Sequence, residues 1–515
     1  MKTIKLLSVL VLGAFAAGCA DFDDDSKTQT TGSANFTKYV SIGNSITAGY
    51  QSSSLFEAAQ LRAYPKLIAS QVGTNFAIPT VAGDGIGGRI KWNGSFVGSS
   101  PAFTYAPLAG GAPNNAGYYA TANYNNLGIP GMITVIPGTS ALGNATDYFD
   151  VNVNNTGSDA LVGPGGVGGS RGNPYFNVVL RNGTKGTSVS AAVDSLKPTF
   201  VTLWLGNNDV LGYATNGGTS PSAPTDETVF EAKYAAILDH VLNLSSAPKV
   251  AVATIPNVVT IPFFTTVNPG LASSLPSGVS LRFQKSTEST AVGSGTATAA
   301  ELRAYKHMVT LLASSQLGKL GQPYGGWIKR LADSQNLTVA QFYAAVLAPA
   351  GVDTTQAFGL HPQNPLPNYL ILDEDEIVKA ATAVAMLNGK IKSIAAASAR
   401  SSRVAVVDVN AEFTRVANAT AAGSSVAFQG IPVTTAFITG GLFSYDGVHP
   451  SDLGHGLIAN MFIQSINAKF GASIKEIQLQ GLAGVRFGKA APNTHLNVVM
   501  PEGSLDNMLR AVGAF

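Results

Sequence analysis

Short apolar runs alternate along the chain with longer segments in which apolar residues recur at helical spacing. The short runs, rich in apolar and β-branched residues, predict strands over 37–43, 199–205, 249–255 and 404–409. The longer segments predict helices over 55–72, 227–244, 374–397 and 451–470. Pro65 predicts a bend in the first of these helices. Strands that alternate with helices are typical of a three-layer α/β domain with a parallel central sheet.

Composition and charge exclude two classes of protein. Of the 515 residues, 45% are hydrophobic and only 12% are charged, whereas disordered chains combine low hydrophobicity with high net charge. Lysine and arginine together number 32 and the acidic residues number 30. These basic residues form no cluster of the kind that nucleic-acid binding requires, so we exclude nucleic acid as a partner.

The N-terminus has the pattern of a secretory signal. Lys2 and Lys5 precede a mostly apolar run over 6–17, which is too short to span a membrane. Residues 16–19, Ala-Ala-Gly-Cys, resemble the lipobox of bacterial lipoproteins, with alanine where leucine is usual. The resemblance implies a signal peptide over 1–18, lipidation of Cys19 and a flexible polar tether over 19–36.

The anchor implied for Cys19 would hold the protein at the bacterial outer membrane, facing the periplasm or the cell surface. Cys19 is the only cysteine, so the chain can form no internal disulfide. An ordinary signal peptide with an incidental cysteine remains the alternative interpretation.

Candidate chemistry lies at two places far apart in the chain. Ser45 follows the first predicted strand directly, at the sheet edge where α/β proteins present reactive groups, although many such serines only cap helices or turns. Asp446 and His449 are spaced so that the carboxylate can reach one imidazole nitrogen while the other faces a serine. An aspartate and a histidine at this spacing also occur by chance, or as a pair of metal ligands. The remaining histidines are interpreted as structural or surface residues: His240, His307, His361, His455 and His495.

Four short blocks, over 42–50, 126–131, 206–209 and 446–449, resemble in their order the motifs of the SGNH/GDSL hydrolases, a family of GDSL-like lipases and acylhydrolases. The first block, Gly-Asn-Ser-Ile, departs from the usual Gly-Asp-Ser-Leu. The resemblance implies a flavodoxin-like α/β/α fold with a parallel central sheet.

The same resemblance implies a serine esterase. Ser45 would be the nucleophile, with Asp446 and His449 as its partners, and no metal or cofactor would be needed. The oxyanion hole would be formed by the backbone N–H groups of Ser45 and Gly131 and by the side-chain amide of Asn208. Taken alone, the last two residues would be read as turn residues.

Members of this family can be much shorter than 515 residues. We therefore predict one hydrolase domain over 37–471, with insertions near 75–119 and 256–367. The C-terminal extension over 472–515 carries no assignable pattern.

The resemblance leaves the ester substrate open. We expect a lipase or small-acyl esterase that cleaves a carboxylic ester through an acyl-serine intermediate. Residues 261–264 could line an acyl pocket, form a lid or only cover the sheet. One alternative is an esterase that deacetylates polysaccharides. Another, from a different class, is a non-catalytic surface lipoprotein that binds glycans.

Overall fold

The computed structural model describes residues 29–97, 100–105, 124–134, 149, 174–180, 188–218, 223–285, 293–482 and 498–512. The expected signal peptide, Cys19, the first part of the tether, His495 and parts of both insertions lie outside these residues. Among the described residues, no helix is both long enough and apolar enough to cross a membrane.

A five-stranded parallel sheet forms the centre of the molecule. Its strands, in spatial order, are β11 (Val404–Val407), β6 (Lys249–Ala253), β5 (Phe200–Trp204), β1 (Tyr39–Gly43) and β4 (Asn126–Gly128). Four of them are the predicted strands. The fifth, β4, was not predicted, because a three-residue strand is too short to show a pattern. Ranked by sequence, the order is 2-1-3-4-5, and the winding direction reverses between β1 and β5.

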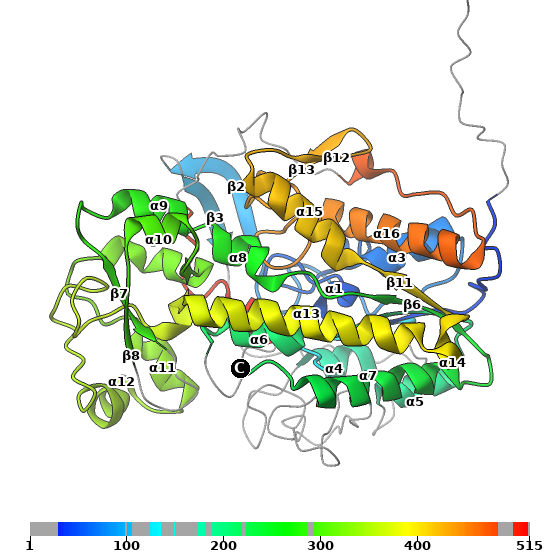
Figure 1. Ribbon diagram of the computed structural model, residues 1–515, viewed down its shortest axis with the longest axis horizontal. Helices are drawn as coiled ribbons and strands as arrows, with labels where there is room; N and C mark the ends of the chain where they lie inside the picture. Colours follow the sequence, from blue (N-terminus) through cyan, green and yellow to red (C-terminus); the bar gives the residue numbers. More distant parts are fainter. Residues whose placement is uncertain are drawn as a thin grey trace, which may run out of the picture.

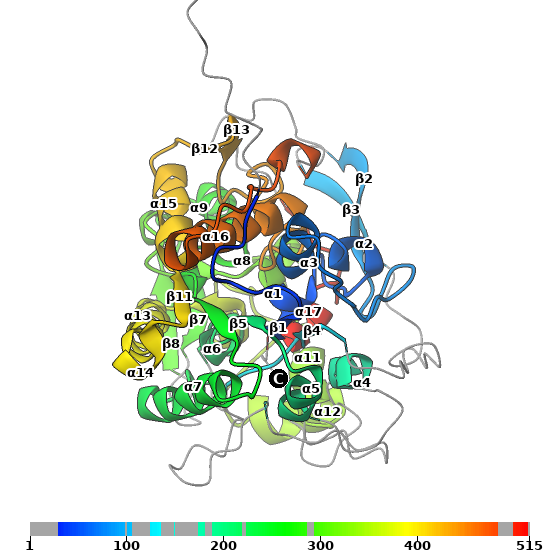
Figure 2. The ribbon, with the colours of Figure 1, turned by 90° about the vertical axis from the view of Figure 1, so that its right-hand side faces the viewer.

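Helices pack on both faces of the sheet (Figure 2). On one side lie α3 (Tyr64–Gln71), α15 (Val409–Ala421) and α16 (Asp452–Phe470). On the other side lie α5 (Val189–Leu196), α7 (Glu227–Leu242) and α13 (Glu374–Ala396), and α13 crosses the molecule beside β11 (Figure 1). The chain therefore has the α/β architecture that the alternating pattern predicts.

The predicted helix over 55–72 is wrong as a single bent helix. The segment forms α2 (Glu57–Gln60) and α3, and Pro65 lies in the first turn of α3. Proline is accepted there because the N–H groups of the first turn have no partner within the helix. Pro65 therefore starts a helix instead of bending one.

The structure describes the last eight residues of the expected tether over 19–36. Residues 29–36 pack on the domain, where the backbone N–H and the hydroxyl of Ser33 both donate to the Phe470 carbonyl, at 2.9 and 3.0 Å. Ala34 and Phe36 are buried. The ordered domain thus begins by residue 29, which the polar sequence before Ala34 did not indicate.

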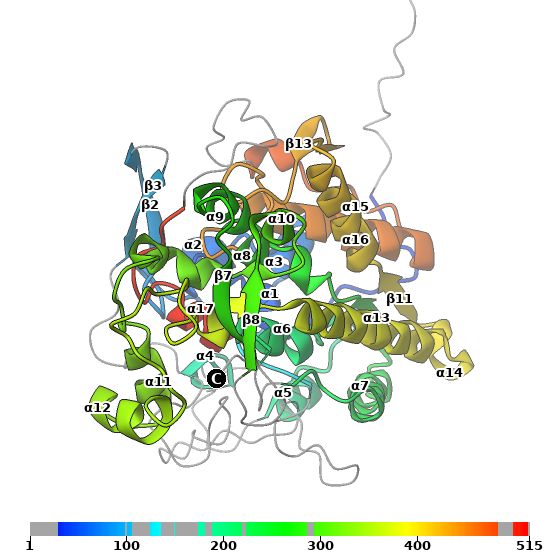
Figure 3. The same cartoon turned by 60° about the vertical axis from the view of Figure 1, so that its left-hand side comes forward.

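Many short elements, mostly from the two insertions, surround the sheet. Those within 256–367 group at one end of the molecule (Figure 3). The remaining elements are α1 (Ser45–Ala48), β2 (Ile90–Val97), β3 (Ser100–Tyr105), α4 (Pro174–Leu180), α6 (Asn208–Thr215), η3 (Val258–Thr260), α8 (Pro262–Thr265), α9 (Asn268–Ser274), β7 (Leu281–Lys285), β8 (Gly293–Ala297), α10 (Ala299–Arg303), β9 (Met308–Val309), η4 (Leu311–Ser315), η5 (Leu317–Lys319), α11 (Ile328–Ser334), α12 (Val339–Phe342), η6 (Tyr343–Leu347), η7 (Asn368–Leu370), β10 (Ile371–Leu372), α14 (Ser398–Ser401), β12 (Val426–Phe428), β13 (Ile431–Val433), η8 (Leu479–Gly481) and α17 (Asp506–Ala511).

Candidate active site

Ser45, His449 and Asp446 form one hydrogen-bonded chain. His449 Nε2 lies 2.9 Å from Ser45 Oγ, and His449 Nδ1 lies 2.9 Å from Asp446 Oδ2. All three side chains are buried, with exposed fractions of 2%, 1% and 0%. Ser45 comes from the end of β1 and the other two from the loop before α16, so the fold joins two distant parts of the chain.

Ser45 is the first residue of α1, and only Asn44 separates it from the end of β1. The Asn44 side chain caps α1 by accepting a hydrogen bond from Ile46 N at 3.2 Å. Gly43, just before this cap, has no room for a Cβ atom, which would lie 2.1 Å from Thr47 Oγ1 and 2.8 Å from the Trp204 carbonyl. A glycine is required there because β1, α1 and β5 approach one another closely.

The Asp446 carboxylate is held by several donors. Its Oδ1 accepts hydrogen bonds from Val448 N and His449 N at 2.9 Å and from Ser444 Oγ at 3.1 Å, and its Oδ2 accepts one from Ser53 N at 3.1 Å. Burial raises the pKa of Asp446, but His449 and these hydrogen bonds outweigh it, so the pKa lies below its ordinary value. The carboxylate is therefore ionised and fixed in one orientation beside the imidazole.

Two of the expected oxyanion-hole donors point at one oxygen atom. The backbone N–H of Gly131 donates to the Ala511 carbonyl oxygen at 2.8 Å, and Asn208 Nδ2 lies 3.5 Å from the same oxygen. Asn208 Nδ2 also donates to the Met132 carbonyl at 2.9 Å. Gly131 has a φ of 83°, a conformation that favours glycine. The geometry thus defines a place where a carbonyl oxygen is bound.

Asp209 connects the two segments that carry these donors, the loop after β4 and the start of α6. Its carboxylate accepts hydrogen bonds from the Thr134 backbone at 3.0 Å, from the Thr134 hydroxyl at 3.0 Å and from the Thr225 hydroxyl at 2.8 Å. Burial raises the pKa of Asp209, and the hydrogen bonds from these threonines offset this only in part. Asp209 therefore fixes the loop after Gly131 against the start of α6, where Asn208 lies.

A small apolar cavity of about 40 Å³ lies beside Ser45 and His449. Its apolar walls include Ile46, Leu211, Val258, Ile261, Phe413 and Phe443. Of the residues considered for a pocket or lid, only Ile261 lines this cavity, whereas Phe263 and Phe264 are fully buried in the core. The cavity could accept a short hydrocarbon group.

Several contacts at the site could not be found from the sequence. Ser53 and Ser444 hold Asp446, and Phe263 N donates to the Gly447 carbonyl at 2.9 Å, which supports the loop between Asp446 and His449. Serines and backbone donors of this kind have no motif. The centre of the Tyr50 ring lies 4.7 Å from that of the His449 ring, and its position at the end of the first block was the only available signal.

The remaining described histidines lie outside this chain of hydrogen bonds. His455 is fully buried, and burial lowers its pKa to about 3, so it is neutral. His240 lies 2.8 Å from Asp194, His307 is half-buried, and His361 Nδ1 accepts a hydrogen bond from Gln363 N within a turn. Within the described ranges, no three His, Cys, Asp or Glu side chains are grouped so that they could hold a metal ion.

Comparisons of the chain with family models, with curated proteins and with solved structures found no match.

Proposed function

We propose that this protein is a serine hydrolase of carboxylic esters, with the flavodoxin-like fold of the SGNH/GDSL hydrolases. The observation that carries the proposal is the buried hydrogen-bonded chain from Ser45 through His449 to Asp446. The strand order 2-1-3-4-5 and the position of Ser45 and Asn208 at the ends of β1 and β5, where the winding reverses, also support it.

The proposed reaction is a two-step acyl transfer. His449 Nε2 takes the proton of Ser45 Oγ as this oxygen attacks the ester carbonyl, and Asp446 stabilises the imidazolium. The tetrahedral intermediate collapses when His449 returns the proton to the leaving alcohol. Water, activated by the same histidine, then attacks the acyl-serine and releases the carboxylic acid.

The developing oxyanion would be bound by the N–H groups of Gly131 and Ser45 and by Asn208 Nδ2. The first and last of these already share one carbonyl oxygen. Donors fixed before the reaction stabilise the transition state without reorganisation, which is why their placement matters for the rate.

The cavity favours a short acyl group. One buried water needs about 10–15 Å³ of such space, so a cavity of about 40 Å³ accepts a group the size of a few methylenes. An acetyl group on a polysaccharide fits the same space, and deacetylation of glycans is the second candidate for this reason. The two candidates share one chemistry and differ only in the alcohol that leaves.

A series of p-nitrophenyl esters, from acetyl to palmitoyl, tests the proposal on the chain from residue 20 onward. We expect kcat/KM to be highest between acetyl and butyryl, and we expect Ser45→Ala to abolish turnover. Ile46 is half-buried and lines the cavity, so Ile46→Ala should enlarge it. The acyl length with the highest kcat/KM should then be longer. Equal rates of p-nitrophenyl ester hydrolysis by the unchanged protein and by Ser45→Ala would instead favour a non-catalytic glycan-binding lipoprotein. Release of acetate from an acetylated polysaccharide, faster than from the p-nitrophenyl ester, would identify the second candidate.

We further propose that Cys19 carries a lipid that anchors the protein to the bacterial outer membrane. The support is the sequence around Cys19 alone. The full chain, expressed with its signal, should partition into detergent, and Cys19→Ala should move it to the aqueous phase. Partition of both forms into water would contradict the anchor.

A further inference from the structure

Residues 498–512, called here the C-terminal segment, reach two of the expected oxyanion-hole donors. The segment contains α17, whose last residue, Ala511, contacts the loop that follows β4. Its Ala511 carbonyl oxygen accepts the hydrogen bond from Gly131 N at 2.8 Å and lies 3.5 Å from Asn208 Nδ2. These are two of the groups that would bind the carbonyl oxygen of an ester.

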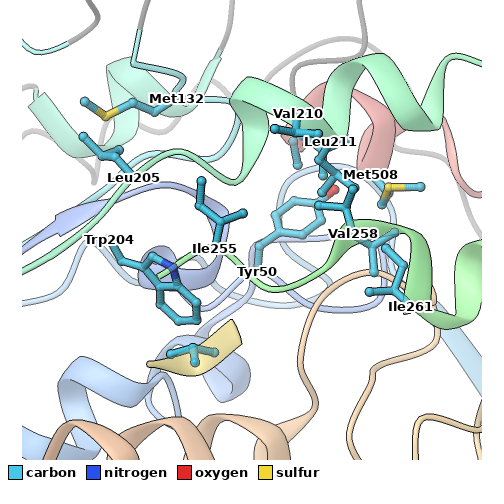
Figure 4. Close-up of a cluster of buried hydrophobic side chains, with 14 of the residues drawn as sticks. Tyr50, Met132, Trp204, Leu205, Val210, Leu211, Ile255, Val258, Ile261 and Met508 are labelled. Atoms are coloured by element: carbon cyan, nitrogen blue, oxygen red, sulfur yellow. The ribbon is translucent and has the colours of Figure 1, made fainter. Parts of the chain in front are cut away.

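Apolar side chains bury the C-terminal segment against the rest of the domain. Leu505 and Leu509 are 2% exposed, and Met508 and Val512 are fully buried. Met508 lies with Leu211, Val258 and Ile261 in one cluster (Figure 4). All three of these neighbours also line the apolar cavity beside Ser45, so the segment packs against the walls of the site.

Polar contacts hold the same segment from outside the site. Asp506 forms an ion pair with Arg330 at 2.5 Å, and both side chains are partly exposed. The Asn507 side chain donates to the Gly87 carbonyl, and Met500 N donates to Ser314 Oγ at 3.1 Å. None of these contacts involves Ser45, His449 or Asp446, so they can be removed without changing the reacting groups.

We infer that the C-terminal segment is an intramolecular inhibitor of this site. The inference rests on the proposed esterase function. An ester can place its carbonyl oxygen between Gly131 N and Asn208 Nδ2 only after the Ala511 carbonyl has left. The segment and the substrate therefore compete, and the apparent kcat/KM equals the intrinsic value multiplied by the fraction of molecules in which the segment is displaced.

Variants that weaken the polar contacts of the C-terminal segment test whether this segment competes with the substrate. Asn507→Ala removes a partly buried hydrogen bond, worth a factor of about 5 in the equilibrium, and should raise kcat/KM by up to that factor. Asp506→Ala removes a partly exposed ion pair and should raise it by about twofold. Lys329→Ala, which removes an exposed ion pair with Asp333 on α11, is the matched control and should change nothing. An unchanged or lower kcat/KM in both segment variants would overturn the inference.

A fluorophosphonate provides a second readout that does not depend on the substrate. Its phosphorus bonds to Ser45 Oγ as the hydroxyl proton passes to His449 Nε2, fluoride leaves, and the phosphoryl oxygen takes the place of an ester oxyanion. We expect faster labelling of Asn507→Ala than of the unchanged protein. Hydrogen exchange of peptides from 498–512 should accelerate once Ser45 is labelled, because the phosphoryl oxygen displaces Ala511.

The outcomes distinguish a failure of the inhibitor proposal from a failure of the esterase proposal. Equal labelling rates, with no change of exchange in 498–512, would overturn the inhibitor and leave the esterase intact. Failure of Ser45 to react in every variant would overturn both. Loss of the residues after Ala511 from the intact mass would show that the Ala511 carbonyl is a substrate, and this would also overturn the inhibitor.

Discussion

His449 Nε2 and Ser45 Oγ lie 2.9 Å apart, although 404 positions of sequence separate the two residues. Asp446 continues this chain of hydrogen bonds on the other side of the imidazole. Both contacts are buried, so their geometry is held by the packed domain and not by solvent-exposed side chains.

Ser45→Ala should remove ester hydrolysis and leave the fold intact. The serine oxygen is the proposed nucleophile, and loss of such a nucleophile lowers kcat by about 10⁶-fold in well-studied serine hydrolases. Thermal unfolding and kcat should be measured on the same preparation. An active Ser45→Ala protein with an unchanged melting temperature would rule out Ser45 as the nucleophile.

Asp446→Asn should lower kcat by about 10⁴-fold, because an amide cannot hold the imidazole in the same tautomer or stabilise its charge. Ser444→Ala removes the 3.1 Å hydrogen bond to Asp446 Oδ1 and the 3.0 Å hydrogen bond that Ser444 Oγ accepts from Ser52 N. It leaves the carboxylate in place, so its effect should be much smaller. The comparison requires kcat for both variants at saturating substrate. Similar losses of kcat in the two variants would show that the Asp446 carboxylate supports the loop structure but does not act on His449.

Asn208→Ala should lower kcat by about 10²–10³-fold with little change in KM, the usual effect of losing one oxyanion-hole donor. Its matched control is Asn243→Ala, which changes an exposed asparagine at the end of α7 that does not line the cavity. A rise in KM at constant kcat would mean that Asn208 binds the ground state and the transition state equally.

His455 should make the folded state sensitive to acid. Burial lowers its pKa from 6.5 to about 3, so below pH 6.5 the unfolded chain gains a proton that the folded protein does not accept. The free energy of unfolding should then fall by up to about 1.4 kcal/mol per pH unit down to about pH 3. Above pH 6.5 this contribution to stability is fully present.

Denaturant unfolding of the unchanged protein and of His455→Gln between pH 7 and pH 4 checks this expectation. Glutamine can still accept the hydrogen bond that Tyr64 N donates to His455 Nδ1 at 3.3 Å, but it does not titrate. The difference between the two proteins isolates the histidine from other acid-sensitive groups. Parallel pH profiles would contradict the prediction.

Most of the sheet could be predicted from the sequence, because buried parallel strands are continuous apolar runs. The runs around Val40, Val201, Val250 and Val404 each became a strand of the central sheet. The strand Asn126–Gly128 could not be predicted, because its three residues gain their strand conformation only by pairing with β1. The helix over 55–72 was wrong because a proline pattern alone cannot distinguish a bend from a new helix start.

Within the candidate site, the sequence indicated Ser45, Asp446 and His449, because their motifs are local. It could not indicate Ser53, Ser444 or Ala511. Ser53 contacts Asp446 across 393 positions of sequence, and Ala511 contacts Asn208 across 303, so no short pattern encodes either contact. Ser444 is only two residues from Asp446, but it belongs to no motif.

By itself, the sequence determined the α/β class, most of the strands and the residue types that carry the proposed chemistry. All of these depend on periodicity or on neighbours within a few positions. Only the tertiary structure decided that Ser45 meets His449 and that Gly131 and Asn208 both face the Ala511 carbonyl oxygen. These contacts join distant segments, and they form only when burial of the apolar core brings those segments together.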